Sequence, residues 1–293
     1  MHRRDFLAVS ASATLAAAAA GSASGGSGEG FAPKPGDGKL KGAIKHSVCR
    51  WCFGGMSLDD LCKNASEMGI SSVELLNPDE FDVPRKYGIG CALANPVKSN
   101  PIGKGLNRIE HHDAIIRELE ERLPLVKAAG VPQQIVFSGN RGGMDDKEGL
   151  KNCAIGLKRI TPLAEQLGIT IVMELLNSKV DHGDYMCDRT PWGVELVKQV
   201  GSARFKLLYD IYHMQIMEGD VIRTITDNFE HIGHYHTAGV PGRHEIDEKQ
   251  ELNYKAISAA IAAKKFGGFL AQEFIPQRDA MKSLREAVVL CDV

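Results

Sequence analysis

The chain alternates short runs of apolar residues with longer segments whose apolar residues recur at helical spacing. The short runs predict eight strands, at residues 43–49, 72–76, 90–94, 134–137, 169–173, 205–209, 232–236 and 269–273. The amphipathic segments predict helices at residues 58–69, 108–129, 145–167, 192–200, 220–228, 254–265 and 278–291. Ser57 is a suitable N-cap for the first of these helices, and Gly69 is a suitable stop.

This repeated order of strand and helix predicts an α/β protein with a single (β/α)8 TIM barrel. Eight such units in about 250 residues match the count and the length of that fold. The competing fold, a doubly wound sheet, is disfavoured because no GxGxxG segment follows the first strand. We assign the barrel to residues 41–293.

The first 40 residues differ in composition from the rest and predict a targeting segment. An arginine pair at positions 3–4 precedes a Phe-Leu pair, and a weakly apolar, Ala-rich run follows at 8–20. This order resembles a twin-arginine export signal, so we predict a signal peptide at 1–23, a flexible linker at 24–40, and a periplasmic or secreted protein. The apolar run is too short for a transmembrane helix, so we expect no stable membrane insertion after export. The alternative is a cytosolic protein with a frayed Ala-rich tail.

Composition restricts the classes of partner. The chain is 43% hydrophobic and 25% charged, with a formal net charge of −2 and no basic block, which argues against a nucleic-acid partner. Cys49 and Cys52 have CxxC spacing, but no second such pair completes a zinc site, and we expect ordinary thiols. A small-molecule substrate is the expected partner, and assembly into a homo-oligomer is left open.

Polar side chains capable of metal binding stand at the carboxyl ends of the last four predicted strands. They are Glu174, Asp210, His236 and Glu273. A barrel places its active site at these ends. Each residue alone would more often be a rim residue or a helix cap, but four on successive strands predict a site for one divalent metal ion. Three carboxylates and an imidazole suit Mn²⁺, Mg²⁺ or Co²⁺, with Zn²⁺ as a further option. Such an ion would polarise the carbonyl of a hydroxy-carbonyl substrate and stabilise an enediolate.

The segment around Asp210 has two interpretations when taken alone. Asp210 ends a buried apolar run, and His213 follows three residues later. Burial of these groups is costly without partners, which favours a metal or substrate site. In the alternative, Asp210 caps a helical turn and His213 is a satisfied rim histidine.

Four segments carry a resemblance to a known family. They are GITIVMELLN at 168–177, KLLYDIYHMQIMEG at 206–219, IGHYHTAGVPGRHE at 232–245 and GGFLAQEFIP at 267–276. Together they resemble hydroxypyruvate isomerase and its relatives in the xylose isomerase-like barrel superfamily. The resemblance implies that Glu174, Asp210, His236 and Glu273 are the metal ligands. It also implies that Glu174 and Glu273 lie on opposite faces of the substrate, one removing a proton and the other returning it.

The same resemblance implies two substrate-binding residues. His213 would bind a substrate oxygen, and Arg243 would bind a substrate hydroxyl or carboxylate, for which its planar fork is suited. The alternatives are a solvated loop charge for Arg243 and a structural partner of a neighbouring carboxylate for His213. His236 stands where the hydroxypyruvate isomerases carry Gln and where sugar epimerases carry His.

We therefore expect a metal-dependent isomerase of the hydroxypyruvate isomerase or ketose epimerase type, acting by Glu-mediated proton transfer. The alternatives on the same site are a sugar 3-epimerase and a dehydratase of keto-inositols or sugars. The non-catalytic alternative is a periplasmic sugar-binding barrel. A DNA-repair endonuclease is disfavoured because its multi-zinc site needs more strand-end histidines. Weaker candidates for the pocket wall, equally well explained as rim or core residues, are Trp51, Glu74, Asn77, Asn95, Asn140 and Arg141.

Overall fold

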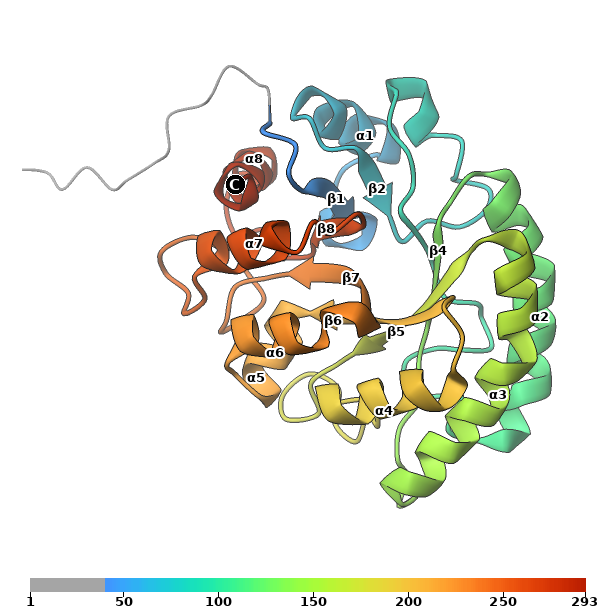
Figure 1. Cartoon of the computed structure of the whole chain (residues 1–293). Helices are drawn as coiled ribbons and strands as arrows, with labels where there is room; N and C mark the ends of the chain where they lie inside the picture. Colours follow the sequence, from blue (N-terminus) through green and yellow to red (C-terminus); the bar gives the residue numbers. More distant parts are fainter. Residues whose placement is uncertain (1–39) are drawn as a thin grey trace, which may run out of the picture. The chain divides into compact units, whose positions relative to one another are not determined.

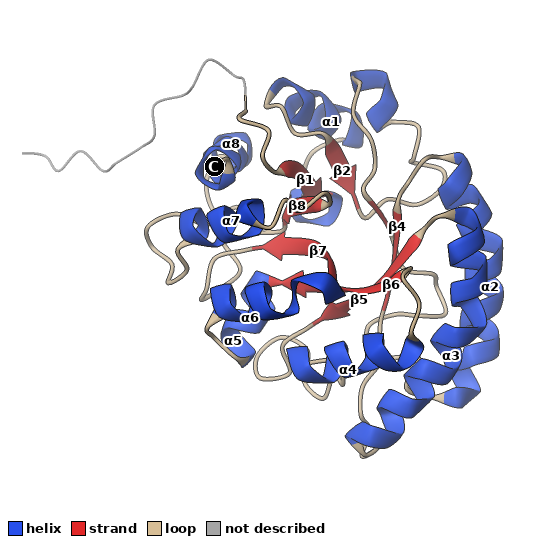
Figure 2. Ribbon diagram, viewed as in Figure 1, coloured by secondary structure: helices blue, strands red, loops and turns tan. Residues whose placement is uncertain are grey.

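A computed structural model describes residues 40–293. The predicted signal peptide and all but the last residue of the predicted linker lie outside this range. Eight parallel strands form one sheet, and the helices lie around its outside (Figures 1 and 2). The predicted (β/α)8 TIM barrel is confirmed. No helix among the described residues is long and apolar enough to cross a membrane.

The strands fall where the apolar runs predict them, with small shifts at their ends. Only the third strand is much shorter than its predicted range of 90–94, since only Leu93 and Ala94 form a ladder with the neighbouring strand. The strands are β1 (Lys45–Cys49), β2 (Ser72–Glu74), β3 (Leu93–Ala94), β4 (Gln133–Val136), β5 (Thr170–Leu175), β6 (Phe205–Asp210), β7 (Ile232–Thr237) and β8 (Phe269–Gln272).

All seven predicted helices are present, and the described residues hold four further helical segments outside the predicted ranges. One of these is a short 3-10 helix after β2, which Pro84 starts and Gly88, in the left-handed region, ends. Another, α5, begins directly after β6, where a helical turn was expected only in the alternative in which Asp210 is a cap. The helices are η1 (Arg50–Phe53), α1 (Leu58–Glu67), η2 (Pro84–Tyr87), α2 (Ile109–Ala128), α3 (Asp146–Leu167), α4 (Thr190–Val200), α5 (Ile211–Met217), α6 (Val221–Asn228), η3 (Phe229–His231), α7 (Tyr254–Ala263) and α8 (Ala280–Cys291).

The sheet is closed almost completely into a barrel. Its strand order is β2-β1-β8-β7-β6-β5-β4-β3, so only the seam between β2 and β3 lacks a regular ladder. Isolated parallel bridges, Ser72 to Gly90 and Leu76 to Ala94, span this seam. The carboxyl ends of all eight strands therefore lie at one end of the barrel, which is where the strand-end side chains meet.

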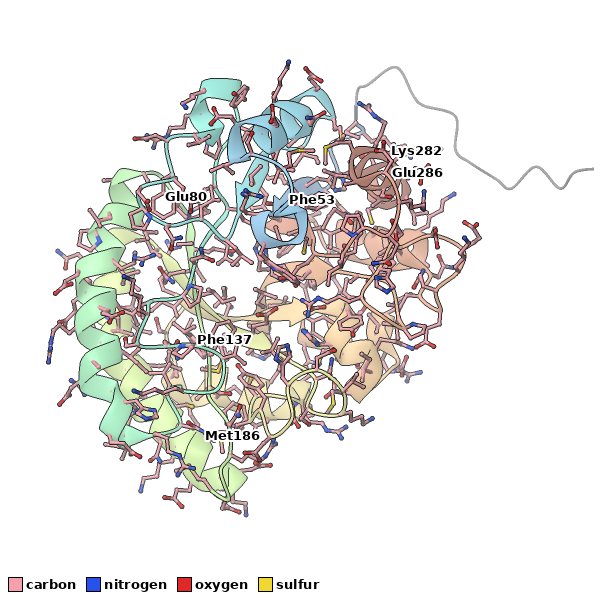
Figure 3. All side chains as sticks on the ribbon, turned by 180° about the vertical axis from the view of Figure 1, so that it is seen from behind. Phe53, Glu80, Phe137, Met186, Lys282 and Glu286 are labelled. Carbon is pink, nitrogen blue, oxygen red and sulfur yellow. The ribbon has the colours of Figure 1, made fainter. Side chains whose placement is uncertain are left out.

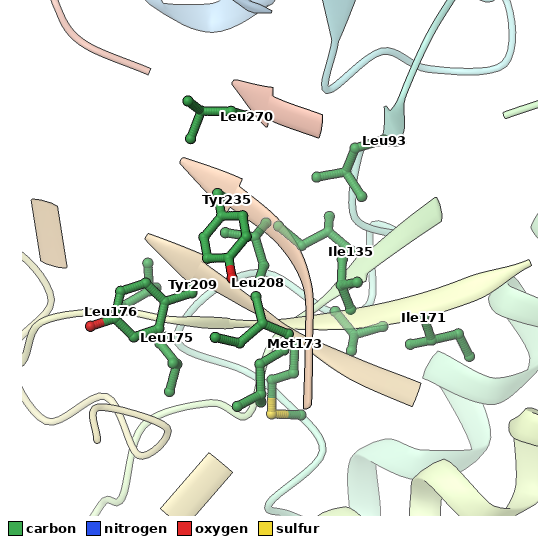
Figure 4. Close-up of a cluster of buried hydrophobic side chains, with 14 of the residues drawn as sticks. Leu93, Ile135, Ile171, Met173, Leu175, Leu176, Leu208, Tyr209, Tyr235 and Leu270 are labelled. Carbon is green, nitrogen blue, oxygen red and sulfur yellow. The ribbon is translucent and has the colours of Figure 1, made fainter. Parts of the chain in front are cut away.

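Alternation along the strands decides which side chains enter the barrel. On β5, Leu175 faces the outer helices, because a Cβ on Gly193 of α4 would meet its Cδ2 at 3.2 Å. Glu174 then points inward. On β7, Tyr235 packs edge to face against Phe266 at a ring distance of 4.8 Å, outside the barrel. Figure 4 shows part of the buried apolar cluster around these strands.

Candidate active site

The four predicted ligand residues meet at the carboxyl end of the barrel. Glu174 and Asp210 belong to the ends of β5 and β6, His236 belongs to β7, and Glu273 follows β8. All four are buried, and one candidate ligand atom from each lies within 4.8 Å of all the others. Asp210 and His236 are direct neighbours in the β6–β7 ladder. Figure 3 shows the chain from behind, with Phe53, Phe137 and Met186 marking segments that follow β1, β4 and β5.

The chemistry of this cluster fits a divalent cation. Three carboxylates in so small a buried space repel one another unless cations lie between them. His236 Nδ1 lies 2.8 Å from Glu273 Oε2 and 3.3 Å from Glu174 Oε1. Glu174 Oε1 is nevertheless buried without a hydrogen-bond partner. A buried carboxylate oxygen without a hydrogen bond, beside two further carboxylates, belongs to a set of hard donors that suits Mn²⁺, Mg²⁺ or Co²⁺.

Arg243 also enters the cluster, from the loop after β7. Its Nη2 donates to Asp210 Oδ2 at 3.2 Å and to Glu273 Oε2, and its Nη1 donates to His213 Nε2 at 2.9 Å. The guanidinium lies between the rings of Trp51 and Tyr212, 5.2 Å from each centroid. The interpretation of Arg243 as a solvated loop charge is therefore wrong.

His213 lies on α5, beside Asp210. Its Nε2 accepts from Arg243 Nη1, so a neutral ring carries its proton on Nδ1, which lies 2.7 Å from the side-chain amide nitrogen of Asn177. Burial, with Arg243 adding to it, lowers the pKa of His213 well below its usual range. Asp210 Oδ1 accepts the backbone amides of Tyr212 and His213, so Asp210 is the N-cap of α5 as well as a member of the cluster. The two interpretations of this segment are compatible.

The two glutamates that were predicted to be catalytic have different surroundings. Burial raises the pKa of Glu174, and the charge of Glu273 adds to the increase. Burial would raise the pKa of Glu273 too, but His236 and Arg243 together hold it well below its usual range. Burial raises the pKa of Asp210 to about 8, although Arg243 opposes the shift. The cluster thus combines one strongly ionised carboxylate with two that hold protons more readily.

Trp51 and Glu74, two of the weaker candidates, contact the site. Trp51 is 46% exposed, and its Nε1 donates to Glu273 Oε1 at 2.8 Å. Its ring therefore forms part of the wall of the site and is not packed in the core. Glu74 is fully buried, and its Oε1 contacts the Nε2 atoms of His234 and His236 at 2.9 and 3.0 Å. Although burial alone would raise it, these histidines lower the pKa of Glu74 to about 2.

Two of the remaining weak candidates have side-chain partners away from the cluster. Asn77 is exposed and bonds to Glu80, and Arg141 pairs with Asp146 and Asp188. All seven cysteines are free, as expected from their spacing. His234 was not predicted, although its position two residues before His236 on one strand places both rings on the same side of the sheet.

Comparison with known proteins identifies the family. Residues 62–289 match the xylose isomerase-like TIM barrel family. The chain belongs to this family. Its relatives include the 2-oxo-tetronate isomerase of Pectobacterium atrosepticum, 29% identical over 232 residues, which are 74% of this chain and 86% of the relative. The hydroxypyruvate isomerase of Escherichia coli K12 is 30% identical over 248 residues, which are 76% of this chain and 90% of that enzyme.

Solved structures agree on the fold. The barrel resembles a family 2 AP endonuclease from Brucella melitensis, with a TM-score of 0.73 at 24% identity, over 82% of this chain and 96% of that one. It also resembles the D-psicose 3-epimerase of Clostridium cellulolyticum H10, with a TM-score of 0.69 at 17% identity, over 85% and 97% of the two chains. The named relatives are isomerases, which supports an enzyme of the isomerase type for the present chain.

Proposed function

We propose that this protein is a metal-dependent isomerase that interconverts small hydroxy-carbonyl compounds, of the kind that hydroxypyruvate isomerase handles, through an enediolate. The observation that carries the proposal is the buried cluster of three carboxylates and His236, in which Glu174 Oε1 has no hydrogen-bond partner. A carboxylate oxygen that is buried and unpaired is available either to a cation or to a proton.

Glu174 and Glu273 are the proposed proton-transfer pair. Their carboxylates come from β5 and from the residue after β8, so a substrate bound between them meets one on each side. Glu273, which His236 and Arg243 keep ionised, is suited to take up the proton next to a carbonyl, and Trp51 and Arg243 fix its carboxylate at Oε1 and Oε2. Glu174, whose pKa burial raises, is suited to carry a proton and to deliver it to the neighbouring carbon. Proton removal leaves charge on the substrate oxygens, where Arg243 can stabilise it.

His213 and Arg243 are the proposed substrate-binding residues. The Arg243 guanidinium presents two nitrogens toward the cluster, a geometry that suits a carboxylate or two neighbouring oxygens. The low pKa of His213 keeps its ring neutral, and its Nε2 can exchange the hydrogen bond from Arg243 for one from a substrate hydroxyl without adding charge. When bound at Glu174, Asp210, His236 and Glu273, a divalent ion supplies Lewis acidity that polarises the substrate carbonyl.

Deuterium exchange tests this proposal directly. Purified protein is treated with chelator, reloaded with Mg²⁺, Mn²⁺ or Co²⁺, and incubated in D₂O with hydroxypyruvate, ketoses and keto-inositols. Mass spectrometry then measures deuterium at carbon in substrate and product. We expect metal-dependent incorporation together with isomerisation. Glu174→Gln and Glu273→Gln should each lose roughly 100-fold or more, since each removes one of the two groups that transfer the proton. Glu195→Gln, at an exposed glutamate on α4, is the matched control.

The outcomes separate the candidate activities. Normal isomerisation by Glu273→Gln would exclude the two-base mechanism. Exchange with inversion at C3 of a ketose would make the protein a sugar 3-epimerase, the candidate that His236 and the D-psicose 3-epimerase fold favour. Loss of water from the substrate would make it a dehydratase. Sugar binding without any exchange would contradict an enzyme.

We also propose export by the twin-arginine route, which rests on the sequence of the first 23 residues. The test is a fusion of the full chain to a reporter that is active only after export, in cells with an intact twin-arginine system. A variant with both Arg3→Lys and Arg4→Lys should retain the fusion in the cytoplasm. Equal export of both fusions would contradict the proposal.

A further inference from the structure

A buried hydrogen-bonded chain runs from the candidate metal cluster toward the opposite end of the barrel. Glu74 Oε1 contacts His236 Nε2 at 3.0 Å and His234 Nε2 at 2.9 Å. His234 Nδ1 in turn contacts Gln133 Oε1 at 2.6 Å. Glu74 and both histidines are fully buried, and Gln133 is 8% exposed. Glu74 lies on β2 and the histidines on β7, strands that are not neighbours in the sheet, so these contacts cross the barrel interior.

The donors and acceptors of this chain can be assigned from its two ends. The carbonyl of Gly233 can only accept, so Gln133 directs its Nε2 toward it, at 2.7 Å, and its Oε1 toward His234. Oε1 accepts, and His234 Nδ1 therefore donates. The Glu74 carboxylate also only accepts, which makes the Nε2 atoms of His234 and His236 donors to one oxygen.

The same rule applies to the other nitrogen of His236. The Glu273 carboxylate only accepts, so without a cation in the cluster Nδ1 also carries a proton and donates to Glu273 Oε2 at 2.8 Å, with Glu174 Oε1 at 3.3 Å. A bound cation would displace the Nδ1 proton, whereas the Nε2 proton stays directed at Glu74. The two histidine rings are nearly perpendicular, at 85° with centroids 5.2 Å apart, so they cannot rotate independently in the packed interior. In metalloproteins a ligating histidine generally donates its second N–H to a carboxylate, which fixes both the tautomer and the ring orientation.

We propose that Glu74 is a positioning residue that holds His236 with its proton on Nε2 and its Nδ1 toward the metal cluster, and that His234 and Gln133 fix Glu74 in turn. This inference rests on the metal site of the proposed function. Glu74 is not one of the four residues of the cluster Glu174, Asp210, His236 and Glu273, so we assign it a role through His236. Its loss would leave His236 free to place the proton on Nδ1, where it blocks coordination.

Metal affinity in Glu74→Gln tests the inference. The side chain keeps its shape but can no longer accept two N–H groups at one charged oxygen. Titration with Co²⁺, followed by calorimetry and by the visible cobalt bands, should show an affinity roughly 10- to 100-fold below that of the wild type. Glu245→Gln is the matched control. Glu245 is a buried carboxylate that accepts from the amides of Gln277 and Arg278 and from the Ser283 hydroxyl, and it pairs with the Arg278 guanidinium at 3.8 Å. The control variant should bind Co²⁺ as the wild type does.

A second variant and a second readout separate positioning from a merely structural role. His234→Gln removes the support of Glu74 while leaving Glu74 and His236 in place, and should weaken Co²⁺ binding less than Glu74→Gln does. Nitrogen NMR of ¹⁵N-histidine-labelled protein bound to diamagnetic Zn²⁺ should show a protonated Nε2 on His236 in the wild type. In Glu74→Gln, the His236 signal should instead show a protonated Nδ1, and the protein should bind Zn²⁺ weakly.

The results also separate the two proposals. A wild type that binds no Co²⁺ would overturn the metal-dependent function and this inference with it. A wild type that binds Co²⁺, with folded Glu74→Gln binding within about threefold of it, would overturn the positioning role alone. If Glu74→Gln does not fold, the His234→Gln variant decides. An unchanged Co²⁺ affinity and an unchanged His236 spectrum in that variant would overturn the positioning role.

Discussion

Asp210 contacts His213 in two ways, since Oδ1 accepts the His213 backbone amide at 3.3 Å and Oδ2 lies 3.5 Å from the ring Nε2. The same carboxylate thus starts helix α5 and faces the candidate metal cluster. These two roles can be separated by substitution, because the cap needs only a side-chain acceptor whereas the cluster needs a carboxylate.

Asp210→Asn should keep the cap and weaken the metal site. We expect its unfolding free energy in chelator to stay close to that of the wild type. Loss of a residue that only supports a metal ligand lowers metal affinity roughly 10- to 100-fold, so loss of a ligand should lower Mn²⁺ affinity by at least as much. Asp210→Ala should lose both, with a further destabilisation of about 1 kcal/mol from the missing cap. Urea denaturation and Mn²⁺ titration measure the two effects. Equal Mn²⁺ affinity in Asp210→Asn and the wild type would exclude Asp210 as a ligand.

Trp51→Phe should slow turnover without disturbing the fold. The change removes the N–H that Trp51 donates to Glu273 Oε1 but keeps an aromatic ring beside Arg243. A hydrogen bond to a charged group contributes about 1.5–3 kcal/mol, and we take the lower end because the side chain is 46% exposed. The expected loss in kcat is about tenfold.

Trp192→Phe is the matched control for this change. The Trp192 Nε1 donates to the Asp146 carbonyl on the outside of the barrel, so a similar hydrogen bond is lost without any contact to Glu273. Steady-state kinetics of both variants with the best substrate decide the question. A similar fall in kcat for both would show that the effect is not specific to Glu273.

The sequence predicted those parts of the site that depend on local periodicity. Glu174, Asp210 and His236 fall at the ends of apolar runs, and a barrel brings such ends together whatever the loops do. Helix α5 was missed because Asp210 is both the last residue of β6 and the N-cap, so no loop separates the two elements. Its seven residues are also too few to show a helical period clearly.

The contacts that were missed cross the barrel. Glu74 on β2 reaches His234 and His236 on β7, and no spacing in the sequence encodes which inward side chains of distant strands meet. Arg243 enters the cluster from a loop with a positive φ of 60°, a conformation that tertiary contacts impose on a non-glycine residue. Only the family resemblance pointed to Arg243.

Arg243→Lys should raise KM selectively for substrates that carry a carboxylate. Lysine keeps the charge but loses the fork that reaches His213 and Glu273 from two nitrogens. We expect KM for a hydroxy-carbonyl acid to rise about tenfold, equivalent to about 1.4 kcal/mol of binding. A ketose without a carboxylate should be affected less, and Arg223→Lys, at an exposed arginine, should leave both unchanged. Equal rises for acid and ketose would contradict carboxylate binding by Arg243.

The burial of His46 should make the free energy of unfolding depend on pH. It lies on β1 and is 1% exposed, and neither ring nitrogen has a hydrogen-bond partner. Burial lowers the pKa of His46 from 6.5 to about 4, although the charge of Asp292 opposes the shift. Between these pH values the unfolded chain binds a proton that the folded chain does not, so stability decreases as pH falls from 6.5 to 4. The His46 contribution to this loss is at most about 3 kcal/mol.

His46→Leu should remove this contribution, because leucine fills the apolar site without titrating. Urea denaturation in chelator at several pH values should give similar stabilities for the two proteins at pH 7 and a growing advantage for His46→Leu toward pH 4. Asp292→Asn, which removes the charge that raises the pKa of His46, should extend the acid-sensitive range below pH 4. Parallel pH profiles for the wild type and His46→Leu would mean that the folded protein accommodates the charged imidazole, with the ring gaining partners or water.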